Sequence, residues 1–171
     1  MINSTVRRLC ALGGAVAAAA GSTPALAAGA TGTATAVTLR PLSIVNTEDL
    51  DFGTLLRGTS AGTVVIDPTN DSRTTTGGVS AAGGSPNAAQ FYTYGGPLQF
   101  VQVTRGPLPV LNRVGGGASM NVTQLTLNGP TTRFLNSAGL LDLRVGGTLA
   151  VNANQQEGDY AGTFQITVTY F

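Results

Sequence analysis

The chain has 171 residues and a formal net charge of +1 at pH 7, and only 10% of its residues are charged. Its nine arginines and eight carboxylates nearly balance, which excludes the strongly basic surface that nucleic acid or an anionic membrane attracts. Histidine and lysine are absent and Cys10 is the only cysteine, so the commonest general base, amine and thiolate nucleophiles and zinc ligands are missing. We therefore expect a protein that is not an enzyme and that holds no metal and no cofactor.

The first residues have the pattern of a secretory signal peptide. Arg7 and Arg8 precede an uncharged apolar run over residues 9–20, and Ala25-Leu26-Ala27 has the small-x-small pattern of a signal peptidase site. This predicts a signal peptide over residues 1–27, which is removed together with Cys10. We expect the remaining chain to be exported through the periplasm to the extracellular cell surface, without a disulfide.

Residues 28–40 are predicted to be an N-terminal extension that precedes a domain of residues 41–171. The extension carries no charge before Arg40, and its alternation places Thr33, Thr35, Val37 and Leu39 on one face of an extended chain. A segment of this kind suits donation as a β-strand to the open sheet edge of another copy. Two other interpretations stay open: the segment is the domain's own first strand, or it is a flexible leader.

The composition of the domain predicts many short strands. Glycine accounts for 24 residues, about twice its usual frequency, and threonine, valine and leucine are abundant. Leu50 and Phe52 lie in an early apolar segment and are expected in the core. Strands are predicted over residues 33–45 with a break at Pro41, and over 50–56, 63–67, 90–94, 98–104, 119–127, 140–153 and 159–171, with a loop over 74–87 and a bulge at Gly146-Gly147. Short strands without intervening helices predict an all-β, immunoglobulin-like antiparallel β-sandwich with Greek-key connections, open to completion by a donor strand.

The last thirteen residues alternate with the two-residue period of a β-strand. Large apolar side chains share one face, whereas alanine, threonine and glutamine occupy the other. This pattern predicts one strand over residues 159–171, half buried in the sandwich. The residues predicted to form its core-facing, donor-accepting side are Tyr160, Phe164, Ile166, Val168 and Tyr170.

Three acidic pairs are the remaining candidates for chemistry. Pairs of carboxylates can ligate calcium or act in glycoside hydrolysis. Each pair lies at a predicted strand end, however, where aspartate commonly caps a turn, and we favour that interpretation. The pairs are Asp49 with Asp51, Asp67 with Asp71, and Glu157 with Asp159.

Four segments carry a resemblance to a known family. They are Leu50-Asp51-Phe52-Gly53-Thr54, Gly62-Thr63-Val64-Val65-Ile66-Asp67-Pro68, Val145-Gly146-Gly147-Thr148-Leu149 and Gly158-Asp159-Tyr160-Ala161-Gly162-Thr163-Phe164. In this combination the chain resembles the bacterial secreted family of domain of unknown function 4402. More loosely, the early Phe-Gly and the closing Gly-x-Tyr-x-Gly resemble spore-coat-U-like and other chaperone-usher pilin subunits. The chain departs from the spore-coat-U pattern because it has no cysteine pair after residue 27.

The looser resemblance implies an immunoglobulin-like sandwich that lacks one strand, which a neighbouring subunit's N-terminal extension supplies. We therefore predict a structural subunit of a pilus-like or fimbria-like surface filament. Its expected partners are other copies of itself or sibling subunits, with a periplasmic chaperone and an outer-membrane usher, and no nucleic acid. The alternative is a monomeric secreted binding module for carbohydrate or another surface ligand, which would use the loop over residues 74–87 with Phe91, Tyr92 and Tyr94.

Overall fold

The structure is a computed structural model that describes residues 29–171. The predicted signal peptide, residues 1–27, therefore lies outside the described residues. The chain divides into two units after Ala36, and all of the strands belong to the second unit, Val37–Phe171. Among residues 29–171 there is no helix with the length and apolar character needed to cross a membrane.

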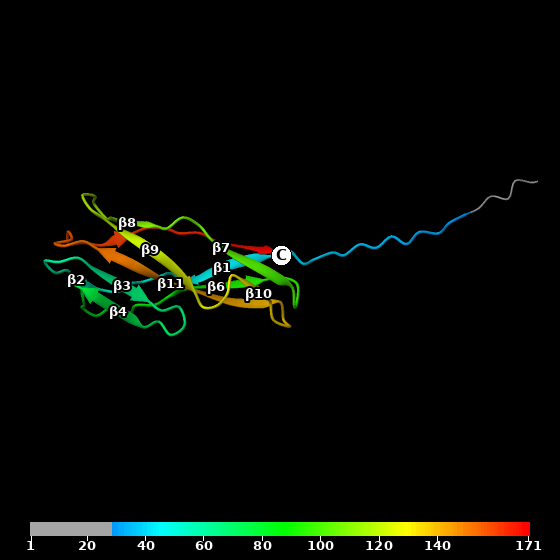
Figure 1. Cartoon of the computed structure of the whole chain (residues 1–171), viewed down its shortest axis with the longest axis horizontal. Helices are drawn as coiled ribbons and strands as arrows, with labels where there is room; N and C mark the ends of the chain where they lie inside the picture. Colours follow the sequence, from blue (N-terminus) through cyan, green and yellow to red (C-terminus); the bar gives the residue numbers. More distant parts are fainter. Residues whose placement is uncertain (1–28) are drawn as a thin grey trace, which may run out of the picture. The chain divides into compact units, whose positions relative to one another are not determined.

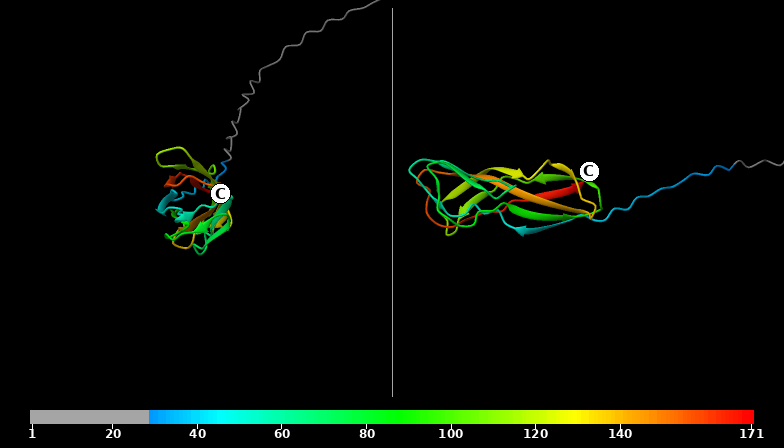
Figure 2. Two further views of the ribbon diagram at one scale, coloured as in Figure 1. Left: turned by 90° about the vertical axis from the view of Figure 1, so that its left-hand side faces the viewer. Right: turned by 90° about the horizontal axis from the view of Figure 1, so that it is seen from below.

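The second unit consists of short antiparallel strands (Figures 1 and 2). Their bounds are β1 Ser43–Glu48, β2 Leu55–Leu56, β3 Gly62–Ile66, β4 Arg73–Gly77, β5 Ser80–Ala81, β6 Ala89–Tyr94, β7 Phe100–Arg105, β8 Val110–Arg113, β9 Ser119–Leu127, β10 Thr132–Phe134, β11 Leu140–Val151, β12 Tyr160–Ala161 and β13 Ile166–Tyr170. This confirms the predicted all-β antiparallel fold class. Residues 29–42 form no strand, so the strand predicted over residues 33–45 is present only in its last part, as β1.

The larger sheet is built around β11 and has the order β1-β6-β11-β9-β8-β12. On one side, β11 pairs first with β6, as far as Val145, and then with β3, from Gly147 onward. The change of partner falls at Gly146, where an added Cβ would lie 2.2 Å from the Ile66 carbonyl oxygen. The bulge predicted at Gly146-Gly147 is wrong, because both glycines pair in register with β9; the register shift lies between Thr148 and Leu149, where Thr123 on β9 is skipped.

A second sheet has the order β10-β7-β13, and β2 pairs with β5 in a separate ribbon. The core lies between the sheets because the strands alternate in burial, as period-two sequences require. Most of its fully buried members come from the inward positions of β3, β7, β9 and β11, and Leu135 directly follows β10. The largest of these side chains are Ile66, Leu125, Leu135, Leu143 and Leu149.

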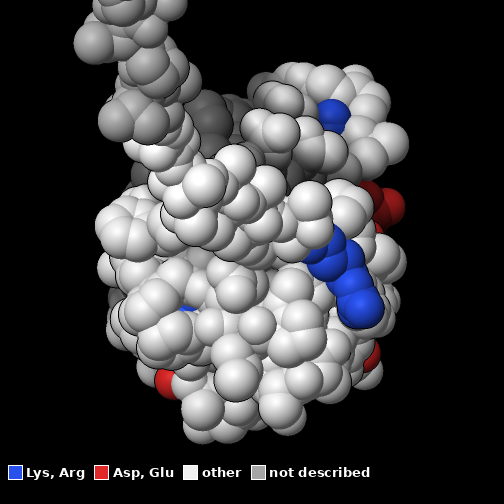
Figure 3. Space-filling view, turned by 90° about the vertical axis from the view of Figure 1, so that its right-hand side faces the viewer, with Lys and Arg blue, Asp and Glu red and all other residues white. Residues whose placement is uncertain are grey.

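One end of this unit is where the C-terminus lies and where β1 begins. The Tyr170 hydroxyl donates to the Arg40 carbonyl oxygen at 2.5 Å and accepts from the Gly96 amide at 2.7 Å. The chain before β1 is therefore held to the end of β13. The space-filling view onto this end shows few Asp, Glu, Lys or Arg side chains over most of the face (Figure 3).

Candidate functional site

An open groove of about 950 Å³ lies in the described part of the chain. One wall is formed by residues 46–57, which follow the middle of β1, and the opposite wall by residues 155–164, which include β12. The floor comes from β9 and β11, through Met120, Val122 and Leu149. The groove thus lies between the first and the last segments of the sandwich, at the end of the unit away from Tyr170.

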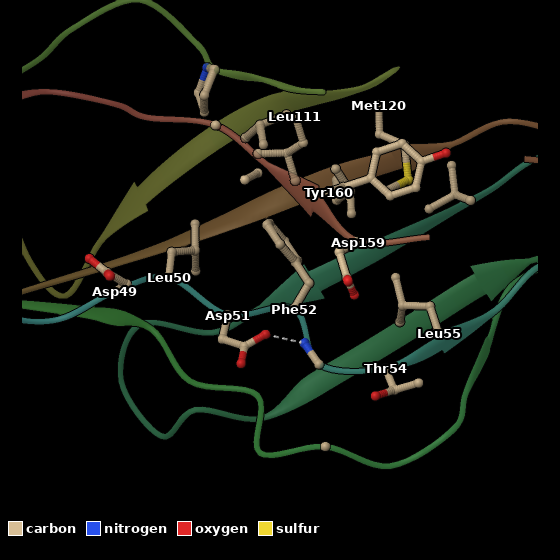
Figure 4. Close-up of a pocket in the computed structure, with 18 of the residues that line it drawn as sticks. Asp49, Leu50, Asp51, Phe52, Thr54, Leu55, Leu111, Met120, Asp159 and Tyr160 are labelled. Atoms are coloured by element: carbon tan, nitrogen blue, oxygen red, sulfur yellow. Dashed lines mark hydrogen bonds between the residues drawn. The ribbon is translucent and has the colours of Figure 1, made fainter. Parts of the chain in front are cut away.

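The interior of the groove is apolar (Figure 4). Phe52 and Leu50 point into it from one wall and Tyr160 faces them from the other, while Leu111 and Met120 line it between the walls. At its inner end the Phe91 and Phe164 rings meet edge to face, with centroids 6.1 Å apart. Phe52, Met120 and Leu149 are already buried, whereas Leu50, Leu111 and Tyr160 are partly exposed. The groove therefore offers a partly apolar base beneath a polar rim.

The groove is bordered by strand edges that have no neighbour within residues 29–171. β1, which lines the groove through Asn46, pairs only with β6, and β12 pairs only with β8. β13, which lies outside the lining, pairs only with β7. Each of these strands therefore presents a row of backbone N–H and C=O groups on its outer side. An extended chain placed between the two borders would satisfy both rows.

The predicted single strand over residues 159–171 is wrong in one respect, because it is two strands. β12 runs antiparallel to β8 and β13 runs antiparallel to β7, but the two registers differ by two residues. The break lies at residues 162–165, where the Gly106 amide still donates to the Gln165 carbonyl at 2.8 Å. Gly162 is required there, since an added Cβ would lie 2.5 Å from the Val110 carbonyl oxygen.

The wall formed by residues 49–54 is fixed by polar contacts from distant segments. The Asp51 carboxylate accepts from the Gly53 amide at 2.7 Å, which is the turn role predicted for it. The Arg73 guanidinium on β4 donates to the carbonyl oxygens of Phe52, Thr54 and Gly83 at 3.0 to 3.2 Å. Sequence reasoning missed Arg73, because it precedes the segment that was predicted to be a loop.

The opposite wall is held by a second polar cluster. Gln155 is buried, and its side-chain amide donates to the Tyr160 hydroxyl at 2.8 Å and to the Ser119 carbonyl at 3.2 Å. The Tyr160 hydroxyl in turn donates to the Gln156 carbonyl at 2.5 Å. These bonds hold the Tyr160 ring against the groove and satisfy its hydroxyl.

The rim of the groove is acidic. Four carboxylates line it, and one of them pairs with Arg57, the only basic side chain among the lining residues, at 3.0 Å through Glu157. The remaining three are Asp49, Asp51 and Asp159. The predicted turn role also holds for Asp67, which accepts from the Thr69 amide at 2.7 Å. Within residues 29–171 no three acidic, histidine or cysteine side chains are grouped so that they could hold a metal ion.

The residues predicted for the accepting strand are not buried equally. Phe52 and Ile166 are buried in the core, while Leu50, Tyr160, Phe164 and Val168 are half buried and pack against it. Tyr170 is half buried at the far end, where it binds Arg40 instead of joining this cluster. The groove therefore brings together Leu50, Phe52, Tyr160 and Phe164, and leaves Ile166, Val168 and Tyr170 outside its lining.

The predicted donor residues Thr33, Thr35, Val37 and Leu39 are all exposed and belong to no strand. Val37 is 86% exposed and Leu39 is 47% exposed. Both lie in the second unit, directly before the contact between Arg40 and Tyr170.

The sequence of the folded unit matches a known protein family. Residues 42–170 match the sequence pattern of DUF4402, a domain of unknown function. The chain belongs to the DUF4402 family. No curated protein and no solved structure matches it. The DUF4402 match includes β1 to β13 and both walls of the groove, and it begins after Leu39.

A partly buried ion pair in this DUF4402 domain was not foreseen from the sequence. The Asp71 carboxylate receives two hydrogen bonds from the Arg144 guanidinium on β11 and one from the Ala88 amide, at 2.8 Å. These bonds, chiefly those from Arg144, hold the pKa of Asp71 below its ordinary value. Asp71 was grouped with Asp67 as a turn residue, but its side chain ties the β3–β4 turn to the central strand.

Proposed function

We propose that this protein is a non-enzymatic structural subunit of an extracellular, pilus-like surface filament, assembled by donation of a β-strand from one copy to the next. The observation that carries this proposal is the open groove, apolar at its base and polar at its rim, between the unpaired edges of β1 and β12. An inserted strand would cover the apolar lining and pair with free backbone groups in one step. The signal-like N-terminus supports export through the periplasm, and the looser pilin resemblance supports the same class of function.

The donor in this proposal is the segment around Thr33, Thr35, Val37 and Leu39 of a second copy. The segment is extended in pattern, uncharged and unpaired, and it carries two exposed apolar side chains. Moving Val37 and Leu39 from water into the groove would contribute about 1.5 to 3 kcal/mol each, before the entropy of ordering the segment. The donor is therefore weak by apolar area, and backbone pairing supplies much of its specificity.

Charge complementarity favours the same occupant. Arg40 directly follows the donor residues and is exposed, and no ion pair joins its side chain to another described residue. The rim of the groove offers Asp49 and Asp159 as exposed carboxylates. When Leu39 of one copy enters the groove of the next, Arg40 reaches that rim, where opposite charge directs the approach.

The point where the donor segment joins the fold and the groove lie at opposite ends of the folded unit, so the assembly would be head to tail. The donor joins the fold beside Tyr170, whereas the groove opens at the other end, between residues 46–57 and 155–164. A contact between two different surfaces of identical copies does not close on itself unless the rotation forms a ring. Repetition therefore gives a filament. Before assembly, the open groove needs temporary cover, which is the role that we propose for a periplasmic chaperone, with an outer-membrane usher for export.

Cysteine crosslinking tests donation directly. In the chain of residues 28–171, which lacks cysteine, Thr35→Cys is combined with Thr163→Cys on the groove wall. Oxidation should give a ladder of disulfide-linked oligomers on a non-reducing gel. The matched control combines Thr35→Cys with Thr74→Cys on β4, which is exposed but outside the groove, and should give no ladder.

Two results of this experiment would overturn the proposal. A monomer with an internal disulfide would mean that the extension closes the sandwich of its own chain. No disulfide, or equal ladders from both pairs, would mean that the groove does not receive this segment. Either result would favour the second candidate, a monomeric binding module.

The second candidate rests on the size of the groove, since about 950 Å³ is within the range of ligand sites. Its predicted binding loop is less suited to this role. The segment over residues 74–87 contains most of β4 and all of β5, and Phe91 faces Phe164 in the groove instead of lying in the loop. Calorimetric titration with oligosaccharides would reveal such binding.

A further inference from the structure

The end of the unit that lies beside Arg40 carries a row of exposed phenylalanines. Phe134 on β10 lies directly opposite Phe100 on β7, and their ring centroids are 3.6 Å apart. On the other side of Phe100, its carbonyl oxygen accepts from the Phe171 amide at 3.1 Å. Residues opposite one another share a sheet face, so Phe134, Phe100 and Phe171 form one row across three adjacent strand ends. We call these three residues the phenylalanine row.

The phenylalanine row faces solvent. Phe100 is 42% exposed, Phe134 is 54% exposed and Phe171 is 83% exposed, whereas the neighbouring Val101 and Leu135 point inward and are buried. Leu98, also on this end, is exposed as well. The surrounding face has few charged side chains (Figure 3). A contiguous apolar patch on an uncharged face is typical of a protein contact surface.

Chain length determines what lies against this face once the donor is placed. The Arg40 carbonyl is bonded to Tyr170, which directly precedes Phe171. Leu39 directly precedes Arg40, and adjacent Cα atoms are about 3.8 Å apart. If Leu39 occupies the groove of a second copy, that copy must touch the end that carries the phenylalanine row.

The groove end offers apolar side chains for this contact. Leu56 on β2 is exposed beside the groove-lining Leu55, and Val114 is exposed beside Asp159, whose carbonyl accepts from the Val114 amide at 2.8 Å. Because the donor side chains are small, a filament needs further buried area at each junction. We infer that the phenylalanine row is the second half of the junction and packs against the groove end of the next copy. This inference rests on the proposed strand donation.

The test compares polar substitutions in the full chain of residues 28–171. Phe100→Ser with Phe134→Ser should raise the protein concentration at which half of the chain is polymeric by tenfold or more in sedimentation velocity. Phe171→Ser, at the end of the chain where folding is not at risk, should raise it severalfold. The matched control is Val110→Ser on β8, which is 45% exposed and lies on the opposite face of the strand from the groove-lining Leu111, and it should leave the concentration unchanged.

Crosslinking separates this inference from the proposed function. At high protein concentration the Thr35→Cys, Thr163→Cys pair should still form its ladder in the phenylalanine variants, because the donor and groove are intact. If the ladder forms and all serine variants polymerise at the wild-type concentration, the phenylalanine row is not part of the junction. If the pair forms no ladder even with the row intact, strand donation fails and the inference fails with it.

Discussion

At the residue scale, the ion pair between Asp71 and Arg144 joins the β3–β4 turn to the central strand β11. Asp71→Asn keeps the acceptor for the Ala88 amide and tolerates the left-handed backbone at this position, where φ is 61°. It leaves the partly buried Arg144 without its charged partner, so we expect a loss of about 1 to 3 kcal/mol in the free energy of unfolding. Urea denaturation would measure the loss. Glu157→Gln, which breaks the exposed pair with Arg57, is the control and should cost less than about 1 kcal/mol.

The same carboxylate gives the stability of the protein a defined pH dependence. Because the pKa of Asp71 is lower in the folded chain than its ordinary value of 3.8, the ionised form stabilises the fold above about pH 4. That contribution is lost as the pH falls through the folded pKa. The difference in unfolding free energy between wild type and Asp71→Asn should stay constant from about pH 5 to 7 and shrink below about pH 4. A difference that persists or grows in acid would contradict this assignment.

At the scale of single elements, β11 depends on one glycine where it changes partner from β6 to β3. An alanine at Gly146 would place its Cβ 2.2 Å from the Ile66 carbonyl and 2.8 Å from the Pro68 ring, and both neighbours are rigid. We expect Gly146→Ala to destabilise the fold by about 1 to 3 kcal/mol in thermal or urea unfolding. At Gly129 the nearest atoms belong to the flexible Arg133 guanidinium, 3.4 Å away, so Gly129→Ala should change stability by less than about 0.5 kcal/mol. Equal effects would mean that the crossing at Gly146 is not tightly packed.

The elements also show what the sequence could reveal. Long alternating segments such as β9, Ser119–Leu127, were predicted with the correct bounds, because half-buried strands repeat every two residues. The strands β8 and β10 were missed, since each has four residues or fewer and prolines lie close by. The alternation over residues 159–171 concealed the break between β12 and β13, because a two-residue register shift preserves the inward face.

The candidate site was predictable only in part, because only its apolar residues follow a periodic pattern. Leu50, Phe52, Tyr160 and Phe164 were identified because apolar residues in strand patterns indicate burial. The contacts that fix the groove were not, since Arg73 and Gln155 act through backbone carbonyls and hydroxyls far along the chain. Such polar contacts leave no periodic signal in a sequence. Their partners become apparent only when the strands are placed.

At the scale of the whole molecule, a donor at one end and a groove at the other make the proposed filament directional, and that direction can be tested. A chain without residues 28–39 keeps every strand and the groove, because β1 begins at Ser43. It can accept a donor but cannot supply one, so we expect it to stay monomeric alone and to cap wild-type filaments when added to them. Mean filament length in electron micrographs should fall as the fraction of the deletion variant rises.

A second variant makes the capping experiment decisive. The same deletion combined with Asp159→Arg reverses a rim charge that is proposed to meet Arg40, and Asp159 is exposed, so the fold should be retained. This variant should cap less effectively, because like charges now face each other where the donor enters. Arg40→Glu in the wild-type partner should restore capping by the reversed variant. If capping is the same for all pairs, the donor end and the groove rim do not meet, and the head-to-tail junction is wrong.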